Sequence, residues 1–199
     1  MIETIDGEKR VDEVVAGDLV RTRDNGFQPV RWVGSRHIGK HNLTIAPHLR
    51  PIRISANSLG TGIPKSDLYV SPQHRILVRS KIVERSFQVN EVLIAAKHLT
   101  DISGIEIAEE VKSVEYFHLL FNQHEIIYSD GAETESLYTG SEALKSIGIS
   151  AREEIFSLFP LLEDTDDIPL AVRQIAPGRK ARNIAMRHQK NERPLVAPL

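Results

Sequence analysis

Short apolar runs separated by turn residues are the feature that most constrains the fold of this chain. From the start to about Leu137, runs rich in Val, Ile, Leu and Tyr alternate with Gly, Pro, Asn and Asp at close spacing. This pattern is typical of many short β-strands. The sequence therefore predicts a mostly β domain.

The clearest local signal is a hairpin at the Asp-Asn-Gly turn of residues 24–26, between VDEVVAGDLVRT and FQPVRWVGSR. Asn-Gly tolerates the positive φ values of a tight turn, so two strands are expected to meet there. Asp18 and Asp24 are explained by turn geometry rather than catalysis.

Three further segments complete the predicted β region. Residues 41–67 are predicted to be an insertion or long loop with PIRIS as one strand, and SPQ in DLYVSPQHRILVRS is predicted to be a corner. Residues 114–137 are predicted to form two strands around Asn122-Gln123. Their YFHLLF run favours a central strand buried on both faces.

After Tyr138 the pattern becomes helical. Ser150 and Glu153 match a capping box, which predicts a helix from about Ala151 to Pro160. The acidic run 163–167 reads as a linker, and a second helical stretch at 171–188 is interrupted by Pro177-Gly178. We therefore predict a β domain over residues 1–140 and a short helical, basic C-terminal appendage over residues 141–199.

The net charge of −2 hides a basic C-terminal end. A solvated or poorly ordered tail is the favoured interpretation, contact with an acidic partner is the alternative, and nucleic acid is not an expected partner. The last 30 residues contain one acidic residue, Glu192, and seven basic ones: Arg173, Arg179, Lys180, Arg182, Arg187, Lys190 and Arg193.

Composition also limits the class of protein. No stretch approaches the roughly 18 to 20 apolar residues of a membrane span, and the start lacks the apolar core of a signal peptide. A soluble protein is expected, cytoplasmic as given or exported as part of a larger protein. The absence of cysteine removes disulfides, thiolate zinc sites and thiol catalysis together.

Two segments carry candidate chemistry. In SPQHRILV, Ser71 stands three positions before His74 at the start of an apolar strand, which places an imidazole at a strand end. In EYFHLLFNQHEII, His118 lies within an apolar run and His124 at the following turn. By themselves these patterns favour a core histidine at 118 and a solvated turn at 124.

The pattern as a whole resembles the Hint family, the fold shared by hedgehog autoprocessing domains and inteins, and within it the bacterial Hint-domain proteins. The resemblance spans about residues 2 to 138. The matching segments are IETIDGEKRVDEVVAGDLVRTRDNGFQPVRWVG, LYVSPQHRILV, AAKHL and VEYFHLLFNQHEIIYSDGAETESL.

The resemblance implies a compact all-β Hint fold and a self-cleaving activity without a cofactor. In this family a cysteine attacks the carbonyl of the preceding residue and converts the peptide bond into a thioester, so the substrate is the protein's own upstream polypeptide. His74 would polarise the scissile peptide and protonate its leaving nitrogen, and Ser71 would stand where the family usually has Thr. His118 and Asp130 are weaker candidates from the facing strands.

This sequence departs from the family pattern at both ends. Met1 falls within the strand that the family cysteine precedes, and Met1 cannot replace that cysteine as the nucleophile. The chain closes on Pro198-Leu199 rather than His-Asn, which disfavours splicing. The chain as given is thus expected to be inactive, and a strand shortened at Met1 could expose an edge that pairs in a homodimer.

Two alternatives from other functional classes remain open. The first is a catalytically silent Hint-fold module kept for structure or protein binding. The second is a metal-dependent hydrolase, for which His37 and His41 would be the pair to suspect. The sequence contains neither a Gly-rich phosphate loop nor a G-x-S-x-G elbow.

Overall fold

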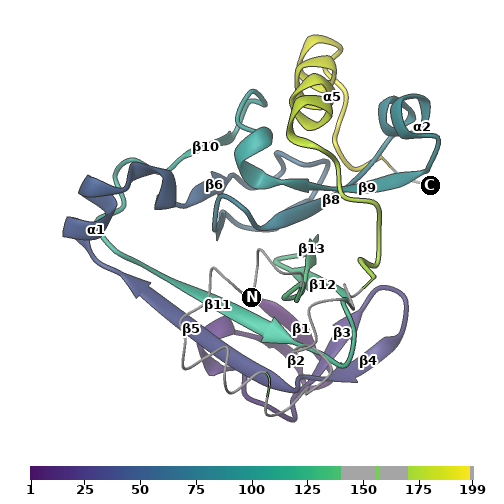
Figure 1. The fold of residues 1–199 in the computed structure, drawn as a ribbon. Helices are drawn as coiled ribbons and strands as arrows, with labels where there is room; N and C mark the ends of the chain where they lie inside the picture. Colours follow the sequence, from purple (N-terminus) through teal and green to yellow (C-terminus); the bar gives the residue numbers. More distant parts are fainter. Residues whose placement is uncertain (140–155, 157–169, 198–199) are drawn as a thin grey trace.

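The computed structural model describes residues 1–139, residue 156 and residues 170–197 (Figure 1). Apart from Phe156, the helix predicted from Ala151 to Pro160 lies outside the described residues. The acidic run 163–167 lies outside them as well. The protein is mostly β, as the sequence predicts.

The largest sheet joins strands that are far apart in the sequence. Its order is β2-β1-β3-β12-β13-β8-β9, and β4 adds to β3 (Figure 1). All of these pairings are antiparallel. The strands are β1 (Ile2–Thr4), β2 (Gly7–Lys9), β3 (Leu19–Thr22), β4 (Gly26–Pro29), β8 (Arg75–Arg79), β9 (Glu91–Ala95), β12 (Ile126–Ser129) and β13 (Ala132–Glu135).

Two hairpin turns show why short polar residues interrupt the apolar runs. The predicted turn at 24–26 is confirmed: β3 and β4 pair from Thr22↔Gly26 onward, and Gly26 has a φ of 64°. Asp130 and Gly131 form the two-residue turn between β12 and β13, with φ values of 50° and 78°. In this second turn both central residues have positive φ, which is the geometry that matches the twist of antiparallel strands.

The YFHLLF run does not form the central strand that its apolar density predicts. It belongs to β11 (Val114–Leu120), which among the described strands pairs with β5 (Trp32–Ile38) alone. Only Leu119 and Leu120 of β11 are buried. The β5–β11 ribbon runs from α1 to the N-terminal strands (Figure 1), and the first half of β11 is exposed or half-buried.

The predicted insertion at 41–67 is more ordered than its prolines suggest. It contains helix α1 (Lys40–Ile45) and the single-turn helix η2 (Pro47–Leu49), although no helix was predicted there. It also contains β6 (Ile52–Ile54), which pairs with β7 (Leu68–Val70) and β10 (Ile105–Ile107). Ile52 and Ile54 are buried in the largest core cluster, and this burial fixes the segment.

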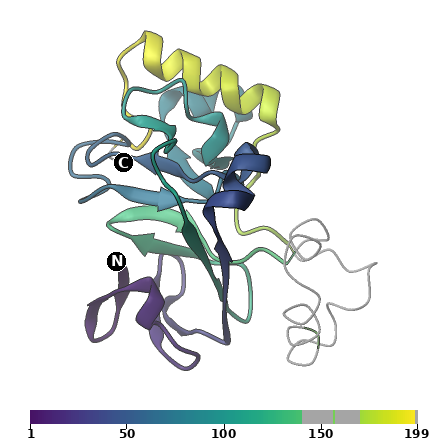
Figure 2. The ribbon, with the colours of Figure 1, turned by 90° about the vertical axis from the view of Figure 1, so that its left-hand side faces the viewer.

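The C-terminal helix α5 (Gly178–Lys190) packs into the same core cluster. Ala181, Ile184, Ala185 and His188 recur at helical spacing and are buried, while the Lys and Arg side chains of the helix are exposed. Figure 2 shows α5 lying across one end of the molecule, beside α2 (Lys81–Phe87). The interpretation of this stretch as a solvated or poorly ordered tail is wrong, because one face of the helix is apolar.

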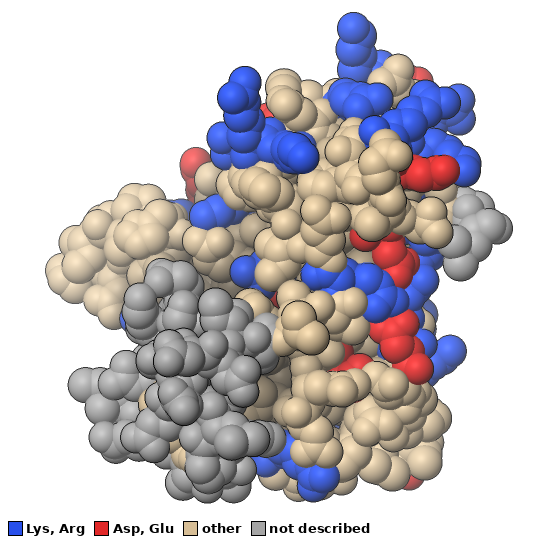
Figure 3. Space-filling model, turned by 45° about the vertical axis from the view of Figure 1, so that its right-hand side comes forward, with Lys and Arg blue, Asp and Glu red and all other residues tan. Residues whose placement is uncertain are grey.

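Backbone bridges join the C-terminal segment to the large sheet on both sides of this helix, and ion pairs of Arg173 add to them ahead of it. Lys and Arg gather over the end of the molecule where α5 lies, and acidic and basic side chains alternate below them (Figure 3). Short parallel bridges join Leu93 to Ile175 and Arg79 to Val196. The ion pairs join Arg23 to Glu91 and Glu133, Arg79 to Glu133, and Arg173 to Glu91 and Asp24.

The single-turn helices η1 (Val11–Glu13) and η3 (Ala96–His98) complete the described elements. Within the described residues, no helix has the length and apolar character that crossing a membrane requires. The division at residue 140 stays a prediction, because about half of the residues that follow it lie outside the described part.

The packing of α5 makes a prediction about stability. Replacing Ile184 with Ala removes a side chain that is 1% exposed and should lower the free energy of unfolding by about 2–4 kcal/mol. Replacing Met186, which is 50% exposed on the same helix, with Ala should change the free energy of unfolding by less than about 0.5 kcal/mol. Urea denaturation of both variants measures this, and equal stabilities would contradict the packing.

Candidate active site

A cavity of about 580 Å³ lies where β1, the corner between β7 and β8, β11 and residues 135–138 converge. Apolar side chains of these elements line much of it, among them Ile2, Val70 and Leu119. The titratable groups at its wall include His74, Arg75, His118, Glu135 and Tyr138. The cavity therefore gathers groups that the sequence separates by more than 60 residues.

The Ser-Pro-Gln-His corner places His74 at the start of β8. Ser71 closes the corner, since both its carbonyl oxygen and its Oγ accept the backbone N–H of His74, at 3.0 and 3.2 Å. The His74 carbonyl in turn accepts the N–H of Ala96 at 2.9 Å. The backbone around the imidazole is thus held on two sides.

His74 and His118 both line the cavity, each half-buried. Burial lowers the pKa of the His74 imidazole, Glu135 opposes this effect, and Arg75 and His124 reinforce it. Burial also lowers the pKa of His118 to about 4, with a contribution from His74. Two neutral imidazoles at neutral pH can each accept one proton.

Glu135 is the carboxylate of the site, at the end of β13. Its side chain accepts the Arg75 N–H at 3.0 Å and the Arg75 Nη1 at 2.7 Å. Burial alone would raise the pKa of the Glu135 carboxyl, but His124, His74 and Arg75 outweigh it, so this pKa lies below the ordinary value. A charged carboxylate therefore persists at the wall of the cavity.

His124 lies behind Glu135 and is not in a solvated turn. It is 7% exposed, and its Nε2 lies 3.5 Å from Glu135 Oε2. The ring of Tyr138 packs against it at 5.0 Å between centroids, and Arg75 lies over the same tyrosine ring at 5.7 Å. The neighbouring Glu125 is buried too, and Asn25 donates a hydrogen bond to its carboxylate at 2.9 Å.

Asp130 holds the end of β1. Its Oδ2 accepts from the Met1 amino group at 2.6 Å, and its backbone N–H donates to the Met1 carbonyl at 2.8 Å. Ser66 Oγ donates to the other carboxylate oxygen at 2.7 Å. Asp130 thus contacts the cavity through Met1, which lines it.

The structure brings three of the four predicted site residues, Ser71, His74 and His118, to one cavity and places Asp130 beside it. Their catalytic roles remain proposals. Sequence reasoning missed Glu135 and misread His124. The available signal for Glu135 was the alternation in AETES, which places Glu133 and Glu135 on the same side of a strand. The sequence alone does not show that Glu135 pairs with Arg75, because this contact depends on the Thr134↔Ile76 register between β13 and β8.

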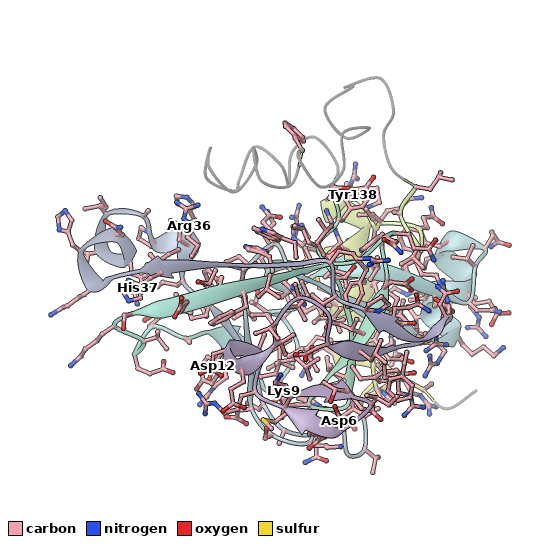
Figure 4. The ribbon with its side chains drawn as sticks, turned by 90° about the horizontal axis from the view of Figure 1, so that it is seen from below. Asp6, Lys9, Asp12, Arg36, His37 and Tyr138 are labelled. Atoms are coloured by element: carbon pink, nitrogen blue, oxygen red, sulfur yellow. The ribbon has the colours of Figure 1, made fainter. Side chains whose placement is uncertain are left out.

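The other histidines do not converge. Arg36 and His37 lie toward the α1 end of the ribbon, well apart from Tyr138 (Figure 4), and His41 belongs to α1. Among the described residues, no three metal-ligating side chains gather as a metal site would need.

Asp18 is confirmed as a turn residue. Its carboxylate accepts the Val15 N–H at 2.9 Å and forms an ion pair with Lys9.

The homodimer hypothesis concerns an edge that a shortened β1 would leave exposed on a neighbouring strand. β1 lies between β2 on one side and β3 and β12 on the other. The edges of the large sheet are instead β2 and β9, and β4 beside β3. A homodimer stays a prediction with no assigned edge.

Comparison with known proteins gives a family match and fold neighbours. A family profile described as Hint domain matches residues 1–141. The chain is similar to the crystal structure of the gp41-1 intein (14% identity, TM-score 0.37), covering 67% of this chain and 91% of that one. It is also similar to a bacterial intein-like domain from Clostridium thermocellum (14%, TM-score 0.41, covering 68% and 94%). No curated protein matches the chain.

The burial of His118 makes a prediction about protonation. Because its pKa is lowered to about 4 in the folded chain, its imidazole should stay neutral from pH 7 down to about pH 4. In urea the same ring should titrate near its ordinary value of about 6.5. The unfolded state then binds more protons between these values, so this group makes the fold less stable as pH falls from about 6.5 to 4.

Histidine ¹³C NMR across this pH range measures the protonation directly. A His118→Asn variant should lose the corresponding part of the pH dependence of the unfolding free energy. A His118 signal that titrates near pH 6.5 in the folded protein would contradict the burial of the ring.

Proposed function

The chain belongs to the Hint domain family, and on this premise we propose that the cavity around His74 is an autoprocessing site. It cleaves a peptide bond in polypeptide joined ahead of β1, by intramolecular acyl shift to a cysteine thiol. The substrate is this joined polypeptide. No metal or cofactor takes part in the proposed step.

The observation that carries the proposal is the meeting of the β1 end and His74 at one cavity. Met1 and Ile2 line it together with Ser71 and His74. Asp130 fixes the direction of the strand end through the Met1 carbonyl. Chain extending from this end is therefore close to an imidazole, a hydroxyl and a second imidazole.

The chemistry needs one group that first accepts and then donates a proton. A thiolate attacks the carbonyl carbon of the preceding residue, the carbon–nitrogen bond breaks, and the nitrogen leaves as an amine after it gains a proton. The thiol's proton can move to neutral His74 and from there to the leaving nitrogen, which balances the step. The lowered pKa of His74 keeps the ring neutral beforehand and makes its protonated form a stronger acid afterwards, while Glu135 opposes this lowering and so helps the ring to take up the proton.

Ser71 and His118 support this step in different ways. Ser71 Oγ accepts the His74 N–H, and its hydroxyl hydrogen can donate to a carbonyl oxygen in the cavity. His118 presents a second neutral imidazole from β11. We assign Ser71 to carbonyl polarisation and His118 to the opposite wall of the same cavity.

The 199 residues contain no cysteine, so the thiol has to be supplied from outside them. This requirement makes the function testable by addition. A reporter protein followed by a Cys is joined ahead of Ile2, with linkers of several short lengths between the Cys and Ile2. We expect that adding dithiothreitol releases the reporter, and mass spectrometry of both products measures this.

Replacing His74 with Ala should slow this release by at least about 100-fold, the usual size of an acid–base contribution. Replacing His48, an exposed histidine of η2, is the matched control and should leave release unchanged. An intact fusion at every linker length, in protein that is folded by circular dichroism, would contradict the proposal. It would favour a module kept for structure or protein binding.

A further inference from the structure

The side chain of Glu135 lies between Arg75 and His124, which approach its carboxylate from different elements. Arg75 supplies a backbone N–H and a guanidinium N–H at 3.0 and 2.7 Å. His124 faces Oε2 from the other side, at 3.5 Å from its Nε2. Because Glu135 is only 7% exposed, these neighbouring groups rather than water decide whether its carboxyl stays charged.

The state of the His124 ring is set by the C-terminal segment. The backbone N–H of Val172 donates to His124 Nδ1 at 3.2 Å. A neutral imidazole with an accepting Nδ1 carries its proton on Nε2. The Nε2 atom is buried and makes no hydrogen bond within the described part of the chain, but it lies 3.5 Å from Glu135 Oε2. The Val172 contact therefore turns a hydrogen toward Glu135.

Val172 is held firmly where this contact needs it. The next residue, Arg173, pairs with Asp24 at 2.7 Å and with Glu91. Leu93 of β9 donates its N–H to the Gln174 carbonyl and accepts the N–H of Ala176, both at 2.9 Å. This segment lies beyond residue 141, where the family match ends, and yet it borders the site.

We propose that residues 172–176 belong to the active site, by fixing His124 as a hydrogen donor to Glu135, and that Glu135 is a positioning residue for His74. The chemical consequence rests on the proposed function: a carboxylate at this wall makes His74 easier to protonate, and His74 has to carry a proton before the amide can leave.

Glu135 and His74 line the same cavity, together with Arg75 and His118. The charged and titratable groups around His74 support the assignment of Glu135 as its positioning residue. Arg75 on β8, His124 ahead of β12 and His118 on β11 all disfavour its protonation or compete for the proton. Glu135 on β13 is the group that acts in the opposite direction and raises the pKa of His74. Removing its charge should therefore have the larger effect on His74 than removing any one of the others.

The first test concerns Glu135 and uses the full chain with ¹³C-labelled histidine. Glu135→Gln keeps the shape and an oxygen for Arg75 but has no charge. The pKa of His74 should fall by roughly one unit, as expected for the loss of a neighbouring opposite charge. Glu135→Asp, which keeps the charge, should restore part of this shift. An unchanged His74 titration in Glu135→Gln would overturn the role of Glu135.

The second test concerns the C-terminal segment. Val172→Pro removes the donor N–H, and Val172→Ala keeps it. Imidazole ¹⁵N shifts should report the Nε2–H form of His124 in the wild type and in Val172→Ala. In Val172→Pro they should report a mixture of forms. A pure Nε2–H form in folded Val172→Pro would overturn the role of the segment.

A pair of His124 variants covers the case in which Val172→Pro does not fold. His124→Gln can still donate to Glu135, whereas His124→Asn can accept from Val172 but does not reach Glu135. The pKa of Glu135, followed by carboxyl ¹³C NMR, should be higher in His124→Asn than in His124→Gln. Equal values would overturn the proposal. None of these readouts needs cleavage, so failure of this inference is separate from failure of the autoprocessing activity.

Discussion

The β12–β13 hairpin is the element on which the rest of the structure depends. It lies in the middle of the large sheet, where β12 pairs with β1 and β3 and β13 pairs with β8. Backbone hydrogen bonds of this one hairpin thus connect the N-terminal strands to the second half of the chain. Without it, the end of β1 and His74 would have no common wall.

The same hairpin carries charge to the site in a way that the interior can tolerate. Asp130 at its turn binds Met1, and Glu135 at its far end binds Arg75. An unpaired carboxylate in these positions would be costly, since burial favours the neutral form. Each carboxylate instead has more than one donor, so the cavity retains a fixed negative charge beside two neutral imidazoles.

The C-terminal segment shows how a chain can extend the structure of its family. Its helix buries an apolar face in the main core, and the residues before the helix border the site through Val172 and Arg173. The basic residues of α5 are exposed by the same geometry that buries Ile184. Packing and site architecture are therefore linked through one stretch of backbone.

The sequence by itself determined the β character, the turn at 24–26 and the strand-end position of His74, because local turn chemistry and alternation act over a few residues. It also identified the family, through motifs spread over the first 138 residues. Only the tertiary structure decided that β11 lies in a two-stranded ribbon, that His124 is buried, and that Glu135 faces the cavity. Each of these depends on the register between distant strands, and in a single sequence nothing records which apolar runs become neighbours.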